Sequence, residues 1–335
     1  PYIMHGSIGP SAAMACAEVS GAISIWTHSQ GIQPLRLSIA DALNMSPNDI
    51  YLQHVPGAGC YGHNGADDAA FEAALIALFD PGRPVLLKWT REEEHAWEPY
   101  ASAMSMELRG SLDKSGKGFD WSHESYSDTH LARPRSSANG GDPSRLLTTL
   151  SLDPPTPAFR PSPSMGNHAG LHRNIDPYYI FPKVRAVKHL VYELPLRTSA
   201  LRCLGGFANV FAQESFVDEL AAEIDIDPVE FRLRHLEDAR AHDFIRAAAN
   251  RIDWFTCRDE GTGRGIAFSR YCNSKAYAAI AVELFVNDAA EISITKAVVA
   301  ADAGEVVDKA GLKMQLEGGF LQAASWTLYE EVRFD

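Results

Sequence analysis

Apolar and polar positions recur with two different periods along this chain of 335 residues, and the two periods predict strands and helices in alternation. Apolar residues at every second position, or short β-branched and aromatic runs, predict strands. The predicted strands are 22–27, 50–55, 84–89, 104–109, 119–126, 184–194, 277–286 and 292–301. Apolar residues every three or four positions predict helices. The predicted helices are 35–43, 66–79, 211–224, 228–236, 244–252 and 313–332. We therefore expect a mixed α/β or α+β fold.

Turn residues connect these elements. The run at 113–116 predicts a hairpin between strands 104–109 and 119–126. Asn287-Asp288 predicts an antiparallel pairing of the two strands that flank it. Asp227 followed by Pro228 is typical of a helix N-cap and first helical residue.

One long segment, residues 134–176, is rich in Pro, Ser, Gly and Asn. Its length exceeds that of a simple turn, so it either lines a site or links two domains. We therefore divide the chain into 1–133, the loop 134–176, and 177–335. The first and third parts are candidates for two halves of one binding region.

Composition narrows the class of protein. Hydrophobic residues make up 46% and charged residues 22%, as in ordinary globular proteins. The 30 basic and 43 acidic residues give a net charge of −13, which disfavours nucleic acid and anionic membranes as partners. No apolar run approaches the roughly 18 residues of a spanning helix. The five cysteines are widely spaced without a CxxC pair, so zinc ribbons and cysteine-bound iron–sulfur clusters are not expected.

Several short patterns have structural explanations as well as chemical ones. Cys60 and His63 have the spacing of a metal-binding pair, but packing within a loop is the favoured interpretation. The acidic runs at 91–94 and 218–219 are expected on solvated helix faces. Neither a GxSxG nor an HExxH motif is present.

A glycine-rich loop lies between the predicted strand 50–55 and the helix 66–79, with glycines at 57, 59, 62 and 65. Amide groups in such a loop can face an anion, although a tight strand-to-helix turn explains the glycines equally well. The loop lacks the closing Gly-Lys-Ser/Thr of a Walker A motif and does not form a clean GxGxxG.

Two further loops have a similar composition. Arg202 precedes Gly205-Gly206, where its guanidinium could hold a carbonyl, carboxylate or phosphate, or pair with the acidic helix that follows. Gln315 precedes Gly318-Gly319 inside a predicted helix, and suits hydrogen bonds to a heterocycle or plain helix packing. Two adjacent glycines cost a helix about 1–2 kcal/mol. We expect close approach of a backbone or a ligand to compensate.

These motifs occur in a characteristic order: Gln30, then 57–62, then 202–206, then 315–319. In that order and rough spacing the chain resembles the molybdenum-binding subunit of the xanthine oxidase family. It is most similar to the branch of isoquinoline 1-oxidoreductase beta subunits, nicotinate dehydrogenase and membrane-linked aldehyde dehydrogenases. The runs 213–221, 227–236, 271–273 and 301–304 also fit that branch.

The resemblance implies a molybdopterin-binding fold of the xanthine oxidase large-subunit type, and a role for each matching residue. Gln30 corresponds to the glutamine beside the oxo or water ligand of molybdenum, and Arg202 to a residue that contacts cofactor and substrate. We expect these two to be catalytic. The residues implied to bind the cofactor are Gln30, Gly57, Gly59, Cys60, Tyr61, Gly62, Arg202, Gly205, Gly206 and Gln315. The family usually has Gly-Gly-Gly-Phe-Gly in the first loop, and either Cys60 or Tyr61 takes the aromatic place here.

The implied cofactor is molybdopterin cytosine dinucleotide, whose dithiolene holds the molybdenum, so no side chain is expected to ligate the metal. The implied reaction is hydroxylation of an aldehyde or N-heterocycle with water as oxygen donor. Electrons would pass to a partner subunit with 2Fe-2S clusters. A cytochrome c subunit, or a second chain that completes the site, is a further partner. The resemblance implies a bacterial protein and leaves cytoplasm and periplasm open.

Two segments of the family pattern are missing. A cofactor segment should precede the Gln30 region, and the catalytic glutamate should follow the Gln315 region. We therefore expect a central portion of a larger subunit, or a site that a second chain completes. Glu214, Glu317 and Glu330 do not sit in the catalytic motif and are not assigned as the base. The alternatives are a non-catalytic cofactor or assembly scaffold of this fold and an unrelated α/β nucleotide-binding protein.

Overall fold

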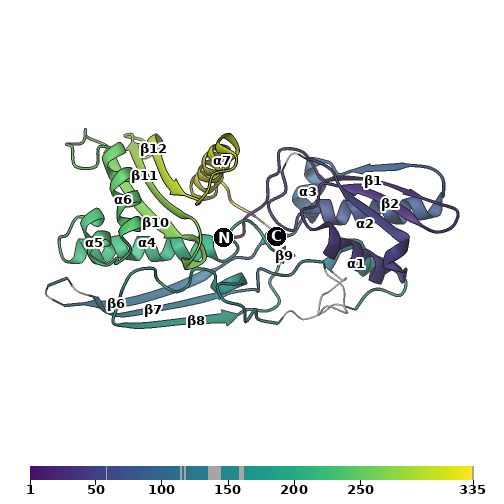
Figure 1. Ribbon diagram of the computed structural model, residues 1–335, viewed down its shortest axis with the longest axis horizontal. Coiled ribbons are helices and arrows are strands. Elements are labelled where there is room, and N and C mark those ends of the chain that lie inside the picture. The colour runs from purple at the N-terminus through teal and green to yellow at the C-terminus, as the bar shows by residue number, and fades with distance from the viewer. Residues whose placement is uncertain (58, 114, 117, 135–144, 158–161, 334–335) are drawn as a thin grey trace.

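A computed structural model describes residues 1–57, 59–113, 115–116, 118–134, 145–157 and 162–333. The molecule is elongated, with two lobes joined side by side (Figure 1). The N-terminus and the short strand β9 lie where the lobes meet in this view.

The first lobe is built on a four-stranded sheet with the order β3-β2-β1-β4. Its strands are β1 (Ala12–Ala17), β2 (Ile23–Thr27), β3 (Ile50–His54) and β4 (Val85–Lys88). Its helices are α1 (Ile32–Leu43), α2 (Gly65–Phe79) and α3 (Arg91–Trp97). Strands β2 and β3 are parallel and α1 connects them, which confirms the strand–helix–strand unit expected from the sequence. Helix α2 packs across β1, β2 and β4, and its alanines fill the core of this lobe.

Strand β1 was not predicted, although it lies inside the sheet between β2 and β4. Its sequence, Ala-Ala-Met-Ala-Cys-Ala, lacks the β-branched residues that normally indicate a strand. The small side chains of Ala13, Ala15 and Ala17 alternate on the buried face beneath α2. Close packing of a helix on the sheet therefore explains a strand that residue propensity disfavours.

The second lobe contains two three-stranded sheets and most of the helices. One sheet consists of β6 (Ser105–Leu112), β7 (Gly118–Ser127) and β8 (Lys183–Leu190). The other consists of β10 (Thr262–Arg270), β11 (Tyr277–Val286) and β12 (Ile292–Asp302). The helices are α4 (Gly206–Glu223), α5 (Pro228–Arg234), α6 (Ala239–Arg251) and α7 (Lys309–Leu328). The predicted hairpins β6–β7 and β11–β12 are confirmed. A core around Trp121, Phe231 and Ile245 packs α4, α5 and α6 against the sheets.

Short elements complete the fold. A parallel pair joins β5 (Tyr100–Ala101) to β9 (Thr198–Ser199). Single 3-10 turns lie at Pro47–Asp49, Leu147–Ser151, Gly170–His172 and Tyr271–Asn273.

Several predicted boundaries were wrong. The helix predicted from residue 244 begins at Ala239, because the Asp238 carboxylate accepts a hydrogen bond from the amide of Arg240. The helix predicted from 313 begins at Lys309, because Asp308 caps it. Strand β10 was missed, since its glycines interrupt the apolar alternation.

The acidic run 91–94 was wrongly predicted to be a solvated face throughout. Glu94 is fully buried and accepts hydrogen bonds from the backbone amide and the hydroxyl of Ser11, at 2.9 and 2.7 Å. It also pairs with Arg91, one turn away. This carboxylate therefore anchors the N-terminal segment to α3.

The segment 134–176 is described at 134, 145–157 and 162–176. Leu146 is buried in the core of the first lobe, and the amide of Leu147 donates to Asp68 on α2 at 2.8 Å. The sheet β6-β7-β8 pairs strands from either side of the segment. The division into 1–133, 134–176 and 177–335 stays a prediction.

Candidate functional site

A cavity of about 650 Å³ gathers residues that are distant in the sequence. Seven of the predicted site residues line it: Gln30, Gly59, Cys60, Tyr61, Gly62, Arg202 and Gln315. Arg133 and Arg173 line it too, although no sequence motif singled them out. We call this space the arginine cavity.

The loop 59–62 reaches the cavity because Gly62 sits directly on the chain segment before Arg202. Gly62 has a φ of +143°, and a Cβ there would lie 2.0 Å from the carbonyl oxygen of Ala200. The next amide, that of His63, donates to the same carbonyl at 2.9 Å. Only glycine permits this approach, so the loop and the Arg202 segment form one continuous wall.

Three predicted cofactor residues do not line the arginine cavity. Gly57 faces His28, where a Cβ would lie 2.5 Å from the histidine Cβ. Gly205 is packed against the backbone of Leu171, and a Cβ would lie 2.2 Å from its carbonyl oxygen. Gly206 is the first residue of α4, beside the side chain of Arg173. The helix predicted from 211 therefore begins five residues earlier, because these glycines fit it against the 170–173 segment.

Arg202 does not pair with the acidic helix that follows it. Its guanidinium donates to the carbonyl oxygen of Gln315 at 3.1 Å and to Oε1 of Gln322 at 3.3 Å. A Cβ on Gly319 would lie 3.0 Å from Nη2 of Arg202. The expected approach of a backbone to the glycine pair in α7 is not seen among the described residues: Gly319 meets a side chain, this guanidinium, and a Cβ on Gly318 would have no neighbour within 4 Å.

The other two arginines are also held by neutral groups. Arg133 donates to the carbonyl oxygen of Gly62 at 3.5 Å. Arg173 donates through Nε to the carbonyl oxygen of His168 at 2.9 Å and through Nη1 to the hydroxyl of Tyr271. Its guanidinium also lies 5.2 Å from the centre of the Tyr271 ring. These contacts orient the guanidinium groups without neutralising them.

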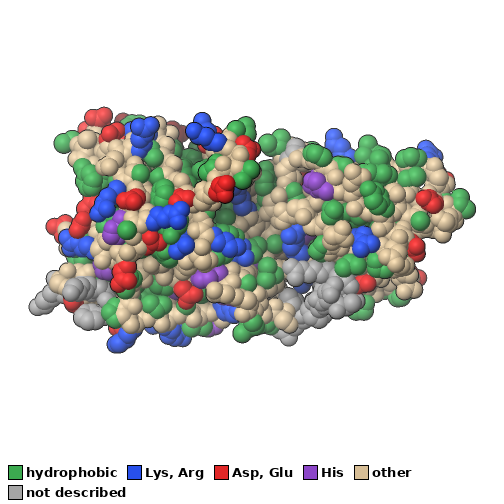
Figure 2. All heavy atoms as spheres, in the orientation of Figure 1, with side chains coloured by type: hydrophobic (Ala, Val, Ile, Leu, Met, Phe, Trp, Pro, Cys, Tyr) green, Lys and Arg blue, Asp and Glu red, His purple; other side chains and the backbone are tan. Residues whose placement is uncertain are grey.

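The cavity therefore carries positive charge, whereas the chain as a whole is negatively charged. Among the described residues no carboxylate lines the arginine cavity, and none forms an ion pair with Arg133, Arg173 or Arg202. Figure 2 shows Lys and Arg side chains around the hollow between the lobes. Three guanidinium groups without an ion pair, in a chain with a net charge of −13, suit an anionic ligand. Burial raises the pKa of the nearby Asp67 and the charge of Arg133 acts to lower it, but the two side chains form no such pair.

A second cavity of about 230 Å³ adjoins the first and is largely apolar. Leu201, Arg202 and Leu204 line both spaces and so form the partition between them. On the apolar side Phe207 and Trp326 meet edge to face, with ring centres 5.0 Å apart. We call this space the apolar cavity. No sequence motif indicated it, because its residues come from distant parts of the chain: the N-terminus, 101–106, His130, 201–204, α4 and α7.

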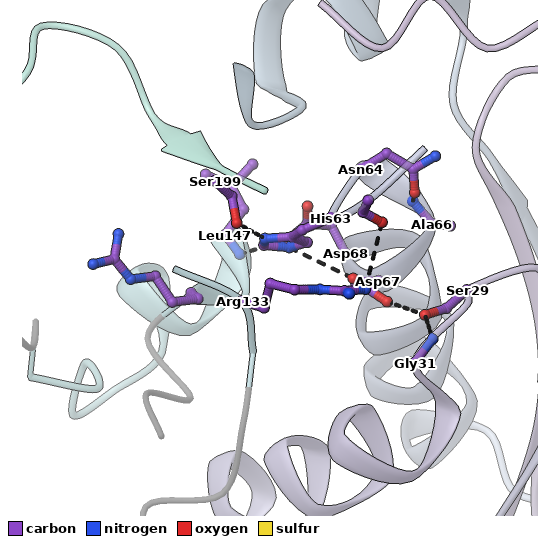
Figure 3. Close-up of polar contacts among 12 residues, drawn as sticks. Ser29, Gly31, His63, Asn64, Ala66, Asp67, Asp68, Arg133, Leu147 and Ser199 are labelled. Carbon is purple, nitrogen blue, oxygen red and sulfur yellow. Dashed lines mark hydrogen bonds and ion pairs between the residues drawn. The ribbon is translucent and has the colours of Figure 1, made fainter. Parts of the chain in front are cut away.

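A network of buried polar side chains lies beneath the glycine loop (Figure 3). Nδ1 of His63 lies 2.9 Å from the hydroxyl of Ser199. Nε2 of His63 lies 3.7 Å from Oδ2 of Asp67, which also accepts a hydrogen bond from Ser29 at its other oxygen. Burial raises the pKa of Asp67 to about 6 and holds the pKa of His63 well below its usual value.

Cys60 and His63 do not converge on a common point. The thiol of Cys60 lies 3.6 Å from the carbonyl oxygen of Gly62 and 3.8 Å from Oδ1 of Asn64. Within the described ranges no group of three or more His, Cys, Asp or Glu side chains has the arrangement of a metal site. The helices in those ranges include none that is both long and apolar enough to cross a bilayer.

Family models match almost the whole chain. A molybdopterin cofactor-binding domain model matches residues 1–139 and 158–236, and a second model of that description matches 217–335. The B subunit of the nicotinate dehydrogenase of Pseudomonas putida is 35% identical over all of this chain and 28% of its own length. The beta subunit of the isoquinoline 1-oxidoreductase of Brevundimonas diminuta is 26% identical over 99% of this chain and 40% of its own length. The chain thus spans less than half of either relative.

Solved structures share the fold. An aldehyde oxidoreductase from Desulfovibrio gigas superposes with a TM-score of 0.54 at 18% identity, covering 88% of this chain and 31% of that one. Quinoline 2-oxidoreductase from Pseudomonas putida 86 superposes with a TM-score of 0.56 at 15% identity, covering 88% of this chain and 39% of that one. These likenesses confirm the predicted fold class. The chain belongs to the molybdopterin cofactor-binding domain family, and within it to the molybdenum-binding subunits of the xanthine oxidase type.

Proposed function

We propose that this chain forms part of a molybdenum hydroxylase, which hydroxylates an aldehyde or an N-heterocycle with water as the oxygen donor. The relatives named above, a nicotinate dehydrogenase and an isoquinoline oxidoreductase, act on N-heterocycles by name. We extend that substrate class, together with aldehydes, to this chain.

The observation that carries the proposal is the set of three unpaired guanidinium groups on one cavity. Arg133, Arg173 and Arg202 present planar donors that match phosphate oxygens. We assign these to the phosphates of molybdopterin cytosine dinucleotide, and the amides of Gln30 and Gln315 to the heterocycle and the metal ligands. Both amides lie on exposed side chains of the same cavity wall.

The donor set of the cavity supports the same assignment. Three guanidinium groups and the two exposed amides of Gln30 and Gln315 line it, and no carboxylate among the described residues does. Guanidinium and amide N–H groups are the donors that phosphate and heterocycle acceptors need. The residues present therefore fit an anionic cofactor rich in acceptors.

The chemistry divides between the cofactor and the chain. When bound, the molybdenum cofactor would supply oxygen transfer to the substrate and accept its electrons. The chain would orient that group through the three arginines and Gln30, while the apolar cavity beside Arg202 excludes water from a ring-shaped substrate.

Glu214 is committed to structure, since its carboxylate bonds to Arg232, Tyr179 and the amide of Phe268. We therefore assign proton removal to a glutamate outside this chain. For electron transfer we propose a partner subunit with 2Fe-2S clusters, with a cytochrome c subunit or a site-completing second chain as further components.

The test uses the purified complex that contains the full subunit. We expect molybdenum and a pterin dinucleotide in the complex, and turnover of nicotinate-like heterocycles or aldehydes with an artificial electron acceptor. In ¹⁸O-labelled water the product should carry the label. A loaded complex that turns over none of these substrates would favour the scaffold instead, and a bound adenine nucleotide without pterin would overturn both.

A further inference from the structure

Two buried side chains meet directly beneath the arginine cavity. His63 is the residue after Gly62, and Asp67 lies one turn further along, in the first turn of α2 (Figure 3). The two residues are 1% and 3% exposed. Neither side chain lines the arginine cavity, so any effect on it must act through other residues.

The first connection runs from Asp67 to Gln30. The hydroxyl of Ser29 donates to Oδ1 of Asp67 and accepts a hydrogen bond from the amide of Gly31 at 3.2 Å. Gln30 lies between these two residues, on the turn that they close. Because the Gln30 side chain is exposed on the cavity wall, its backbone sets where the amide points.

The second connection runs from His63 to the arginines. The hydroxyl of Ser199 donates to the carbonyl oxygen of Ala132, which adjoins Arg133. That hydroxyl must then accept from Nδ1 of His63, at 2.9 Å, so Nδ1 carries the ring proton. Ser199 itself lies three residues before Arg202, on the strand that leads to the contact with the glycine loop.

With this tautomer, one acceptor of the network has no hydrogen-bond donor, which leaves a gap at Nε2 of His63. Nε2 of His63 has a lone pair and no hydrogen-bond partner among the described residues, and it lies 3.7 Å from Oδ2 of Asp67. A proton on Oδ2 would supply the missing donor once the two atoms close from 3.7 Å to hydrogen-bond distance. A bare carboxylate would face a lone pair instead, and could bond to His63 only if the histidine reversed its tautomer and Ser199 released Ala132.

We propose that Asp67 and His63 form a positioning pair, in which one proton between Oδ2 and Nε2 holds Gln30, Arg133 and Arg202 in place around the cavity. The inference rests on the proposed function for the role of those three residues. It assigns a role to Asp67 and His63, which touch neither substrate nor cofactor.

The charges around the pair favour a protonation change near neutral pH. Arg133, Arg197 and Asp68 act on Asp67 in addition to its hydrogen bond from Ser29. Arg197, Arg133 and His5 act on His63. Burial outweighs the arginines at Asp67 and places its pKa at about 6. Below that pH Asp67 holds the proton. Above it the proton is lost, and with it the bond between Oδ2 of Asp67 and Nε2 of His63.

Three variants of the full complex test the pair. Asp67→Asn keeps an oxygen for Ser29 and presents an N–H to His63, so it mimics the protonated acid at every pH. Asp67→Ala removes both connections. Asp68→Asn is the matched control on the same helix, because the Asp68 carboxylate bonds to Arg197 at 2.9 Å and makes no bond to Ser29 or His63.

We expect wild-type turnover to change near pH 6, and Asp67→Asn to retain turnover while removing that inflection. Asp67→Ala should lose about tenfold in kcat, as expected for roughly 1.4 kcal/mol of lost positioning, while keeping its molybdenum. Asp68→Asn should lower thermal stability and keep the inflection, moved to lower pH, because the Asp68 charge helps to raise the pKa of Asp67. An unaltered inflection in Asp67→Asn, or wild-type kcat in Asp67→Ala, would overturn the proposal.

A readout independent of turnover separates this inference from the proposed function. Amide hydrogen exchange in the full subunit should accelerate at 29–31 and 199–202 in Asp67→Ala, remain near wild type in Asp67→Asn, and be unaffected there by Asp68→Asn. Equal exchange in all four proteins would contradict the positioning pair even if the complex proved inactive on every substrate.

Discussion

Arg232 and the three arginines of the cavity carry the same group in opposite surroundings. Arg232 is fully buried between α4 and α5. It bonds to the carboxylates of Glu214 and Asp218 at 2.9 and 2.6 Å. Further bonds reach the carbonyl oxygens of Pro228 and Glu214. Each of the three guanidinium nitrogens donates within the protein.

Arg133, Arg173 and Arg202 donate their hydrogen bonds to neutral groups, and all three side chains line the cavity. The comparison shows what distinguishes a structural arginine from one that can bind a ligand. The presence or absence of an ion pair with a carboxylate is more informative than the position of the arginine in a sequence motif. A buried charge needs its partner to be tolerated at all, whereas an unpaired charge beside a cavity retains its capacity to bind. Five substitutions test this difference, taken from the largest expected effect to the smallest.

Replacing Arg232 by alanine should have the largest effect, because it leaves Glu214 buried without its cation. We expect the free energy of unfolding of the full subunit to fall by about 3–5 kcal/mol. Urea denaturation followed by tryptophan fluorescence would measure it. A loss below about 1 kcal/mol would show that the pairing does not distinguish Arg232 from the cavity arginines.

Glu98 tests, for an acid, the rule that a buried charge needs a partner. Its Oε1 accepts from the amide of His5, Oε2 has no partner among the described residues, and burial, with Glu94 nearby, raises its pKa to about 8. A raised pKa means that the folded state holds the proton more tightly than the unfolded state. Its stabilising contribution is therefore lost as the pH rises from about 4.5 to about 8.

Glu98→Gln should accordingly flatten the fall in melting temperature over that pH range. Thermal unfolding at the two ends of the range would measure the change. A variant whose melting temperature varies with pH as steeply as that of the wild type would show that Glu98 is not held protonated.

Arg202→Ala should affect binding and turnover in place of stability. A charge-assisted hydrogen bond is worth about 1.5–3 kcal/mol, so we expect kcat/KM to fall by about 10- to 100-fold. The melting temperature should stay close to that of the wild type. Arg202→Lys is the control, since it keeps the charge but loses the planar fork. Full activity in the alanine variant would remove Arg202 from the site.

Gln30→Ala should have a smaller effect, because an uncharged amide contributes about 0.5–1.5 kcal/mol per hydrogen bond. We expect a decrease of about 2- to 10-fold in kcat, with folding unchanged. Steady-state kinetics on the loaded complex would measure it. An unchanged kcat together with a stability loss would make Gln30 a structural residue.

Lys296→Ala should have the smallest effect. Lys296 pairs with Asp253 at 2.9 Å, but both side chains are exposed, and surface pairs often contribute nothing measurable. We expect the melting temperature of the variant to match the wild type. A clear destabilisation would mean that pairing matters even in full contact with solvent.

The sequence allowed much of this arrangement to be predicted. The helix α2, the two hairpins and the Asp227 cap follow from local patterns. The ordered motifs, through the family resemblance, indicated seven residues of the cavity wall. Local patterns reflect contacts between near neighbours, and these elements depend mainly on such contacts.

The rest depends on contacts between distant residues. Arg133 and Arg173 border or lie within the segment 134–176, which has no periodic pattern to orient them. Asp67, an acid in a first helical turn, has the usual explanation of an interaction with the helix dipole. Only its contact with Ser29, 38 residues away in the sequence, shows a second role.

The most direct test of the central claim is the molybdenum and pterin content of the full subunit with Arg133, Arg173 and Arg202 replaced together by glutamine. The account predicts a folded protein, with the melting temperature of metal-free wild type, that has lost most of both. A variant that retains the wild-type content of molybdenum and pterin would show that the arginine cavity does not hold the cofactor.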